Sequence, residues 1–106
     1  MIKARMYWNQ LRLECGGHAE YAEFGKDIVC AGVSILTDAL AGSLEEAKIR
    51  GRTQMEWKHK NNVLVISADP NMGAVNEIKA YFRMCVKGMK MLQENYPRNV
   101  EIKEVD

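Results

Sequence analysis

The chain has 106 residues, of which 47% are hydrophobic and 27% are charged, and its formal net charge is +1. This length supports one domain with one core, residues 1–106, and the composition excludes a disordered or fibrous chain. The balanced charge excludes the overall positive field of a typical nucleic-acid binder.

The N-terminal segment alternates apolar and polar residues from Ile2 to Trp8, and alternation resumes from Leu11 to Cys15 after a turn at Asn9-Gln10. This pattern predicts a β-hairpin with one buried face, and it is not the apolar run of a signal peptide. The longest apolar stretch, from Ile28 to Leu36, is far short of the ~20 residues of a membrane span. We therefore expect a cytoplasmic protein whose three cysteines are reduced.

The segment from Gly16 to Lys26 contains three glycines and no periodicity, which predicts a loop. A helix is expected next, with Asp27 as its N-cap and an apolar run from Ile28 to Leu40, followed by a polar stretch over residues 43–52. This run is apolar or small on nearly every helical face, and one sheet can cover only one side of it. We therefore expect a second subunit to cover another side, in a homodimer.

The C-terminal half predicts a second hairpin, a second helix and a last strand. The hairpin comprises residues 53–58 and 63–66, joined through a turn at residues 59–62, with His59 at the surface. The helix begins after the N-cap pair Asp69-Pro70 and carries an apolar stripe with spacings of three and four residues. That stripe consists of Val75, Ile78, Phe82, Cys85, Val86, Met89, Leu92 and Tyr96. The whole chain predicts a two-layer α+β fold of order β-β-α-β-β-α-β, with both helices on one face of a largely antiparallel sheet.

Cys30 and His18 are the residues with the most distinctive chemistry. Cys30 is expected about three residues into the first helix, where free backbone N–H groups and the helix dipole stabilise a thiolate and can hold an oxyanion. His18 follows two glycines that let the loop fold back over the helix start. An imidazole beside a thiol suffices for acyl transfer, because it takes the thiol proton and returns it to the leaving amine. The carboxylate of Asp27 opposes thiolate formation, so His18 and the dipole must outweigh it.

The residues alone leave other roles for the cysteines open. A cysteine in an apolar environment near a helix start is more often a packing residue than a nucleophile. Cys15, His18 and Cys30 together imitate a set of zinc ligands, although the paired spacing of zinc sites is missing, and we expect no metal and no cofactor. Cys15 would act as a resolving thiol in a redox sensor only if the fold brings it near Cys30. Cys85 lies on the apolar stripe of the second helix and is expected in the core.

The segment from Gly17 to Ser34 carries a motif that resembles the signature G-H-A…G-x-D-I-V-C-A-x-V-S of the ribosomal-processing cysteine protease family, Prp. The match includes Gly17-His18-Ala19, the run from Gly25 to Ser34 and the spacing between histidine and cysteine. Gly32 stands where many members have alanine. Outside this segment only the order of elements matches.

The resemblance implies a dimeric endopeptidase that removes the N-terminal extension of ribosomal protein twenty-seven of the large subunit. Its catalytic dyad maps onto His18 and Cys30, and the loop between them becomes a mobile cover over the substrate. Gly17, Asp27 and Ser34 match positions that shape the site. The Ser34 hydroxyl either faces the thiol one turn away or bonds a carbonyl of its own helix.

Aromatic and basic residues suggest contacts with a partner. Tyr21 and Phe24 in the loop either pack on substrate side chains or pin the loop. A basic stripe on the second helix is either a solvated face or a contact with ribosomal RNA or an acidic segment. It consists of Lys79, Arg83, Lys87 and Lys90. The competing hypothesis is a non-enzymatic, ribosome-associated module that binds peptide or RNA and in which Cys30 is inert.

Overall fold

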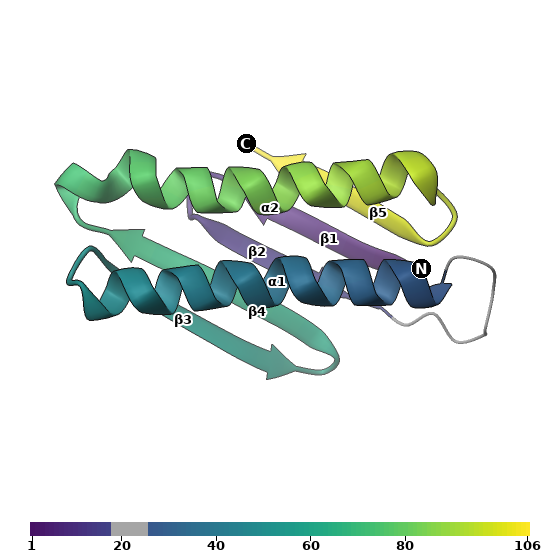
Figure 1. Ribbon diagram of the computed structural model, residues 1–106, viewed down its shortest axis with the longest axis horizontal. Coiled ribbons are helices and arrows are strands. Elements are labelled where there is room, and N and C mark those ends of the chain that lie inside the picture. The colour runs from purple at the N-terminus through teal and green to yellow at the C-terminus, as the bar shows by residue number, and fades with distance from the viewer. Residues whose placement is uncertain (18–25) are drawn as a thin grey trace.

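The computed structural model describes residues 1–17 and 26–106, and these residues form a sheet covered on one face by two helices (Figure 1). The elements follow the predicted order: β1 (Ile2–Tyr7), β2 (Arg12–Gly16), α1 (Lys26–Ile49), β3 (Thr53–Lys60), β4 (Val63–Pro70), the short 3-10 helix η1 (Met72–Ala74), α2 (Val75–Asn95) and β5 (Val100–Val105). The strand order is β3-β4-β2-β1-β5, and all pairs are antiparallel except β1 with β5. The predicted two-layer α+β architecture is confirmed.

The sheet buries alternate residues of its strands under the helices, because side chains of a strand point to its two faces in turn. The pairing of Met6 with Leu13, and of Ala4 with Cys15, brings buried residues of β1 and β2 opposite one another. The buried apolar residues of the strands are Ile2, Ala4, Met6, Leu13, Cys15, Ile66, Ala68, Val100 and Ile102. This apolar face fixes the register, since a shift by one residue would turn every one of these side chains to solvent.

Helix α1 contributes to the core through one stripe whose members lie three or four residues apart. The stripe consists of Val29, Val33, Thr37, Leu40, Leu44 and Ala47. The hydroxyl of Thr37 lies 3.0 Å from the carbonyl oxygen of Val33 and 3.1 Å from that of Ser34, so burial leaves it hydrogen-bonded. The segment Ile28–Ile49 is long and apolar enough to cross a membrane by length and composition alone. In this fold, its apolar stripe packs against the sheet.

The two helices approach closely at two glycines. A Cβ added to Gly88 of α2 would lie 2.5 Å from Cδ2 of Leu36, and one added to Gly32 of α1 would lie 3.0 Å from Cδ1 of Leu92. Each glycine therefore makes room for a leucine of the other helix. The thiol of Cys85 lies 3.7 Å from the carbonyl oxygen of Leu36 in the same contact.

Several predicted boundaries were wrong because local propensity competed with tertiary packing. Helix α1 begins at Lys26 rather than after Asp27. It also continues to Ile49, through the polar stretch that was expected to follow the helix, because Leu44 and Ala47 extend its buried stripe. Asp69 was expected to cap the second helix, but it lies in β4, where it pairs with Gln54 of β3.

The second hairpin also differs from its prediction in the position of its turn. Strand β3 continues to Lys60, so His59 lies within the strand, opposite Leu64, rather than in the turn. The turn itself is the pair Asn61 and Asn62, which have φ angles of 54° and 65°. Two residues with positive φ match the twist of the flanking strands, and asparagine adopts this conformation readily.

Candidate functional site

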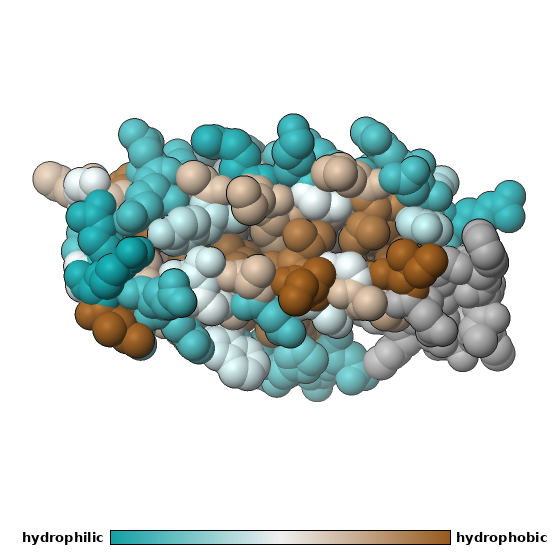
Figure 2. Space-filling model, in the orientation of Figure 1, coloured by the Kyte–Doolittle hydropathy of each residue, from teal (hydrophilic) through white to brown (hydrophobic). Residues whose placement is uncertain are grey.

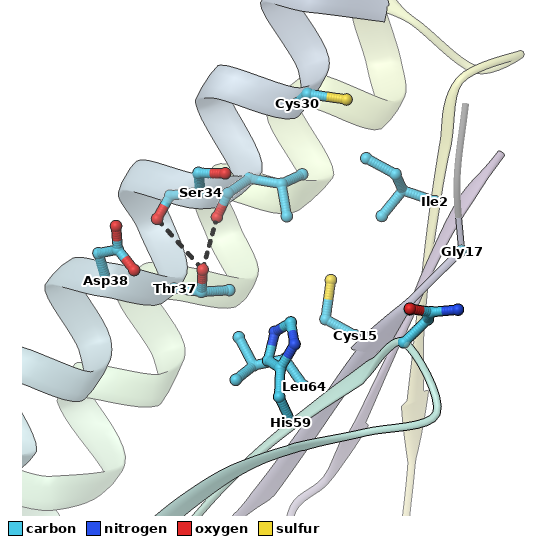
Figure 3. Close-up of a pocket in the computed structure, with 12 residues that line it drawn as sticks. Ile2, Cys15, Gly17, Cys30, Ser34, Thr37, Asp38, His59 and Leu64 are labelled. Atoms are coloured by element: carbon cyan, nitrogen blue, oxygen red, sulfur yellow. Dashed lines mark hydrogen bonds between the residues drawn. The ribbon is translucent and has the colours of Figure 1, made fainter. Parts of the chain in front are cut away.

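A cavity of about 330 Å³ lies between the start of α1 and one end of the sheet (Figure 3). Helix α1 contributes Cys30, Val33, Ser34, Thr37 and Asp38 to it. The strands and the turns at their ends contribute Ile2, Cys15, Gly16, Gly17, His59, Asn62 and Leu64. Five of the lining residues, including Ser34 and His59, are exposed, so the cavity opens to solvent.

Cys30 is half-buried, and its side chain extends from α1 toward this cavity (Figure 3). Since α1 begins at Lys26, Cys30 is its fifth residue and not its third. The backbone N–H groups that lack helical partners belong to the residues just before it, and the helix dipole acts most strongly in that first turn. Ser34 follows Cys30 by one turn and lines the same cavity. Its carbonyl accepts the hydrogen bond from Thr37, whereas no bond from its own hydroxyl occurs among the described residues.

The other two cysteines are buried, as predicted. Burial raises the pKa of the Cys15 thiol to about 11. Burial, together with the nearby Cys15, raises the pKa of Cys85 to about 12. Both thiols are therefore protonated at neutral pH and are weak nucleophiles.

Cys15 and Cys30 line the same cavity. The fold therefore meets the condition stated above for a redox sensor in which Cys15 is the resolving thiol. The raised pKa of Cys15 nevertheless disfavours that role, because a resolving thiol must attack as a thiolate.

The remaining predicted site residues differ in how far the structure describes them. Gly17 lies at the cavity with a φ of 102°. His18, Tyr21 and Phe24 lie outside the described residues, as does the loop expected to cover the substrate. The backbone of Asp27 belongs to the first turn of α1, while its side chain is outside the described part.

Sequence reasoning missed His59, which was expected at the surface with no role. The residue is exposed, but it stands on β3 at the cavity, at the opposite end from Cys30 (Figure 3). The alternation of Met55, Trp57 and His59 along one strand would have shown that these side chains share a face. His59 is thus a second imidazole to test beside His18.

The basic stripe of α2 is partly engaged within the fold. Lys90 forms an ion pair with Glu104 of β5, at 2.5 Å, whereas Arg83 and Lys87 are exposed. The pKa of Glu104 lies below its usual range, chiefly because of the bond from Lys90. The indole N–H of Trp8 lowers this pKa further by donating a hydrogen bond of 2.9 Å to the same carboxylate. A contact between this stripe and RNA stays a prediction.

Known structures share this fold along nearly the whole chain. The protein SMU.848 from Streptococcus mutans superposes with a TM-score of 0.71 at 24% identity, over 99% of this chain and 94% of that one. The essential ribosomal processing protease Prp from S. aureus, in complex with a substrate peptide, gives a TM-score of 0.76 at 19% identity, over 99% of this chain and all of that one (100%). The same S. aureus protease with a covalently linked product peptide gives a TM-score of 0.74 at 19% identity, with the same coverage of 99% and 100%.

At the level of sequence, no curated protein matches the chain. The model of one family, described as cysteine protease Prp, matches residues 1–101. This match covers both helices, the strands β1 to β4 and the start of β5, so it extends well beyond the motif around Cys30 and excludes a purely non-enzymatic module. The chain is a cysteine peptidase and belongs to the Prp family of cysteine proteases.

Proposed function

We propose that the protein is an endopeptidase in which Cys30 is the nucleophile and His18 the general base, and that its substrate is the N-terminal extension of ribosomal protein twenty-seven of the large subunit. The observation that carries the assignment of Cys30 is its half-buried thiol at an open cavity, while the two other thiols are buried. The similar S. aureus protein is a ribosomal processing protease with a bound substrate peptide, which supports the substrate class.

The position of Gly17 supports His18 as the base. Gly17 lines the same cavity as Cys30, and His18 is the next residue of the chain. His59 lines the cavity as well, and only experiment separates the two histidines.

The reaction proceeds through an acyl-enzyme. His18 takes the proton of the Cys30 thiol, and the sulfur attacks the carbonyl carbon of the scissile peptide bond. The N–H groups at the start of α1 stabilise the oxyanion, and His18 returns the proton to the leaving amine as the C–N bond breaks. Water then hydrolyses the thioester, with His18 taking a proton from the water and the Cys30 sulfur as the leaving group. In this proposal Asp27 and Ser34 shape the site, and Tyr21 and Phe24 contact the substrate.

The decisive experiment follows the alkylation of each cysteine in the folded protein against pH, by mass spectrometry. We expect Cys30 to react at neutral pH, and Cys15 and Cys85 to react only after unfolding, because their raised pKa values keep them protonated. His18→Ala should move the Cys30 profile to higher pH, whereas the matched control His59→Ala should leave it unchanged. Slow alkylation of Cys30 that does not depend on His18 would remove the assignment.

Cleavage of the substrate peptide gives the second readout. Cys30→Ala should abolish cleavage, and His18→Ala should lower kcat/KM by about 10²–10⁴-fold, the usual contribution of a positioned base. Circular dichroism should show that both variants remain folded. Activity near that of the wild type in either variant contradicts the dyad.

We further propose that the protein acts as a homodimer in the cytoplasm. Helix α1 exposes apolar residues on the side away from the sheet, among them Ile28 and Ile35, and apolar surface gathers over α1 and toward α2 (Figure 2). Exposed apolar surface of this kind is typical of a face that a partner covers. The three cysteines are free thiols, which agrees with a reducing compartment.

A further inference from the structure

The cavity at Cys30 continues into a second one along α1. This second cavity, of about 250 Å³, shares Thr37, Asp38, His59 and Leu64 with the first. It extends to Ala41, Gly42, Glu45, Trp57 and Ile66. Together the two form one groove, here called the α1–β3 groove, with α1 as one wall and the helix-facing side of β3 and β4 as the other.

The groove is long enough for a peptide segment. Cys30, Ser34, Asp38, Ala41 and Glu45 follow one another at three or four residues along α1, so they share one helical face. From Cys30 to Glu45 the helix rises by about 22 Å, at about 1.5 Å per residue. An extended peptide advances about 3.3 Å per residue, so about six or seven of its residues span this distance.

The far half of the groove combines two carboxylates with an aromatic ring. Asp38 and Glu45 lie on the α1 side, and Trp57, which is 52% exposed, lies on the β3 side. Among the described residues that line the two cavities there is no Lys or Arg, and neither carboxylate takes part in an ion pair or hydrogen bond with any described residue. Gly42 adds no side chain there, and a Cβ at its position would meet nothing within 4 Å. This half is thus open, acidic and aromatic.

We propose that the α1–β3 groove is the arm of the substrate site that selects a Lys or Arg side chain about four to six residues from the scissile bond. The cation lies between the carboxylates of Asp38 and Glu45 and against the ring of Trp57, which attracts it through its π-electrons. The inference rests on Cys30 as the nucleophile, because that position sets the distance along the peptide. It makes Asp38, Glu45 and Trp57 specificity-determining residues outside the chemical step.

A binding experiment tests the groove separately from catalysis. The variant Trp8→Phe/Cys30→Ala retains Trp57 as its one tryptophan and has no nucleophile. The probe is the extension peptide of ribosomal protein twenty-seven from the same organism, with its charged residues replaced by Gln and a single Lys moved through every position on both sides of the cleaved bond. Fluorescence of Trp57 reports its binding. Cleavage of the same peptides by the wild-type enzyme is measured in parallel.

We expect Lys within one window, four to six residues from the cleaved bond, to tighten binding about 5- to 10-fold at low salt, and Glu there to weaken it. The gain should vanish in Asp38→Asn/Glu45→Gln and fall as salt is raised. Glu46→Gln is the matched control, since Glu46 is exposed beside Glu45 but does not line the groove. A flat Lys scan, or a preference that survives the double substitution, overturns the inference. Failure of the wild-type enzyme to cleave counts against the proposed function instead.

Discussion

Gly17 occupies a backbone conformation that side chains disfavour, at the point where β2 meets the candidate site. Its φ is 102°, and a Cβ added there would collide with the carbonyl oxygen of Met1. The start of β1 and the end of β2 thereby approach closely beside the cavity. Glycine is needed because an L side chain would bring both conformational strain and a steric clash with backbone.

Gly17→Ala should lower the free energy of unfolding by about 1–3 kcal/mol, the cost of a non-glycine residue held in such a conformation. It should also lower the rate of peptide cleavage, because His18 is attached directly to the displaced residue. Urea unfolding and the cleavage assay measure the two effects. Gly73→Ala is the control, since a Cβ at Gly73 meets nothing and its φ is not positive. Equal stability of both variants would show that the chain relaxes around residue 17.

Helix α1 serves a different contact on each of its faces. One stripe faces the sheet, a second faces α2 through Gly32 and Leu36, and a third, with Cys30 and Asp38, lines the α1–β3 groove. The outward face exposes Ile35. Four environments around one helix explain why its sequence is apolar or small on nearly all sides, where a surface helix has one apolar stripe.

The contact between α1 and α2 predicts opposite effects for one substitution at two glycines. Gly88→Ala should destabilise the protein by about 1 kcal/mol, because the new methyl group meets both methyl groups of Leu36 and forces that side chain from its position. Gly42→Ala should stabilise it by about 0.5–1 kcal/mol, since its Cβ meets nothing and alanine is the better helix former. Thermal or urea unfolding tests both, and a stabilising Gly88→Ala would mean that Leu36 repacks at no cost.

At the scale of the whole molecule, the helix layer leaves apolar surface uncovered. The sheet and α2 cover two sides of α1, while Ile35 remains 66% exposed on its outer side. No other element of the described ranges, 1–17 and 26–106, covers this side. The proposed homodimer would bury it against a second copy.

Ile35→Glu should therefore weaken the dimer by about 2 kcal/mol or more, about 30-fold in Kd, because a carboxylate would be buried without a partner. Light scattering across a dilution series measures the mass, and unfolding experiments check that the monomer is folded. Met72→Glu is the control, since Met72 is 92% exposed but belongs to η1 and not to the two long helices. A protein that is monomeric before substitution contradicts the dimer.

The sequence by itself determined the order of elements, the two-layer fold and the family. Periods of 2 and 3.6 residues are local, so the strands and the buried stripe of α2, with Ile78, Phe82 and Met89, follow from neighbouring positions. The motif from Gly17 to Cys30 is also contiguous, and the family match agrees with it. Helix ends were less predictable, because residues such as Leu44 join a helix only when the sheet beneath them is in place.

Only the tertiary structure decided which residues from distant segments share a surface. The parallel pairing of β1 with β5, the cavity that unites Ile2, Cys30 and His59, and the groove between Asp38 and Trp57 all join positions far apart in the chain. Local periodicity says which way a side chain faces but not which strand lies next to it. The order of the strands depends on burying the apolar faces of all five strands together under the helices. This arrangement involves residues far apart in the chain, so it is defined only in the folded molecule.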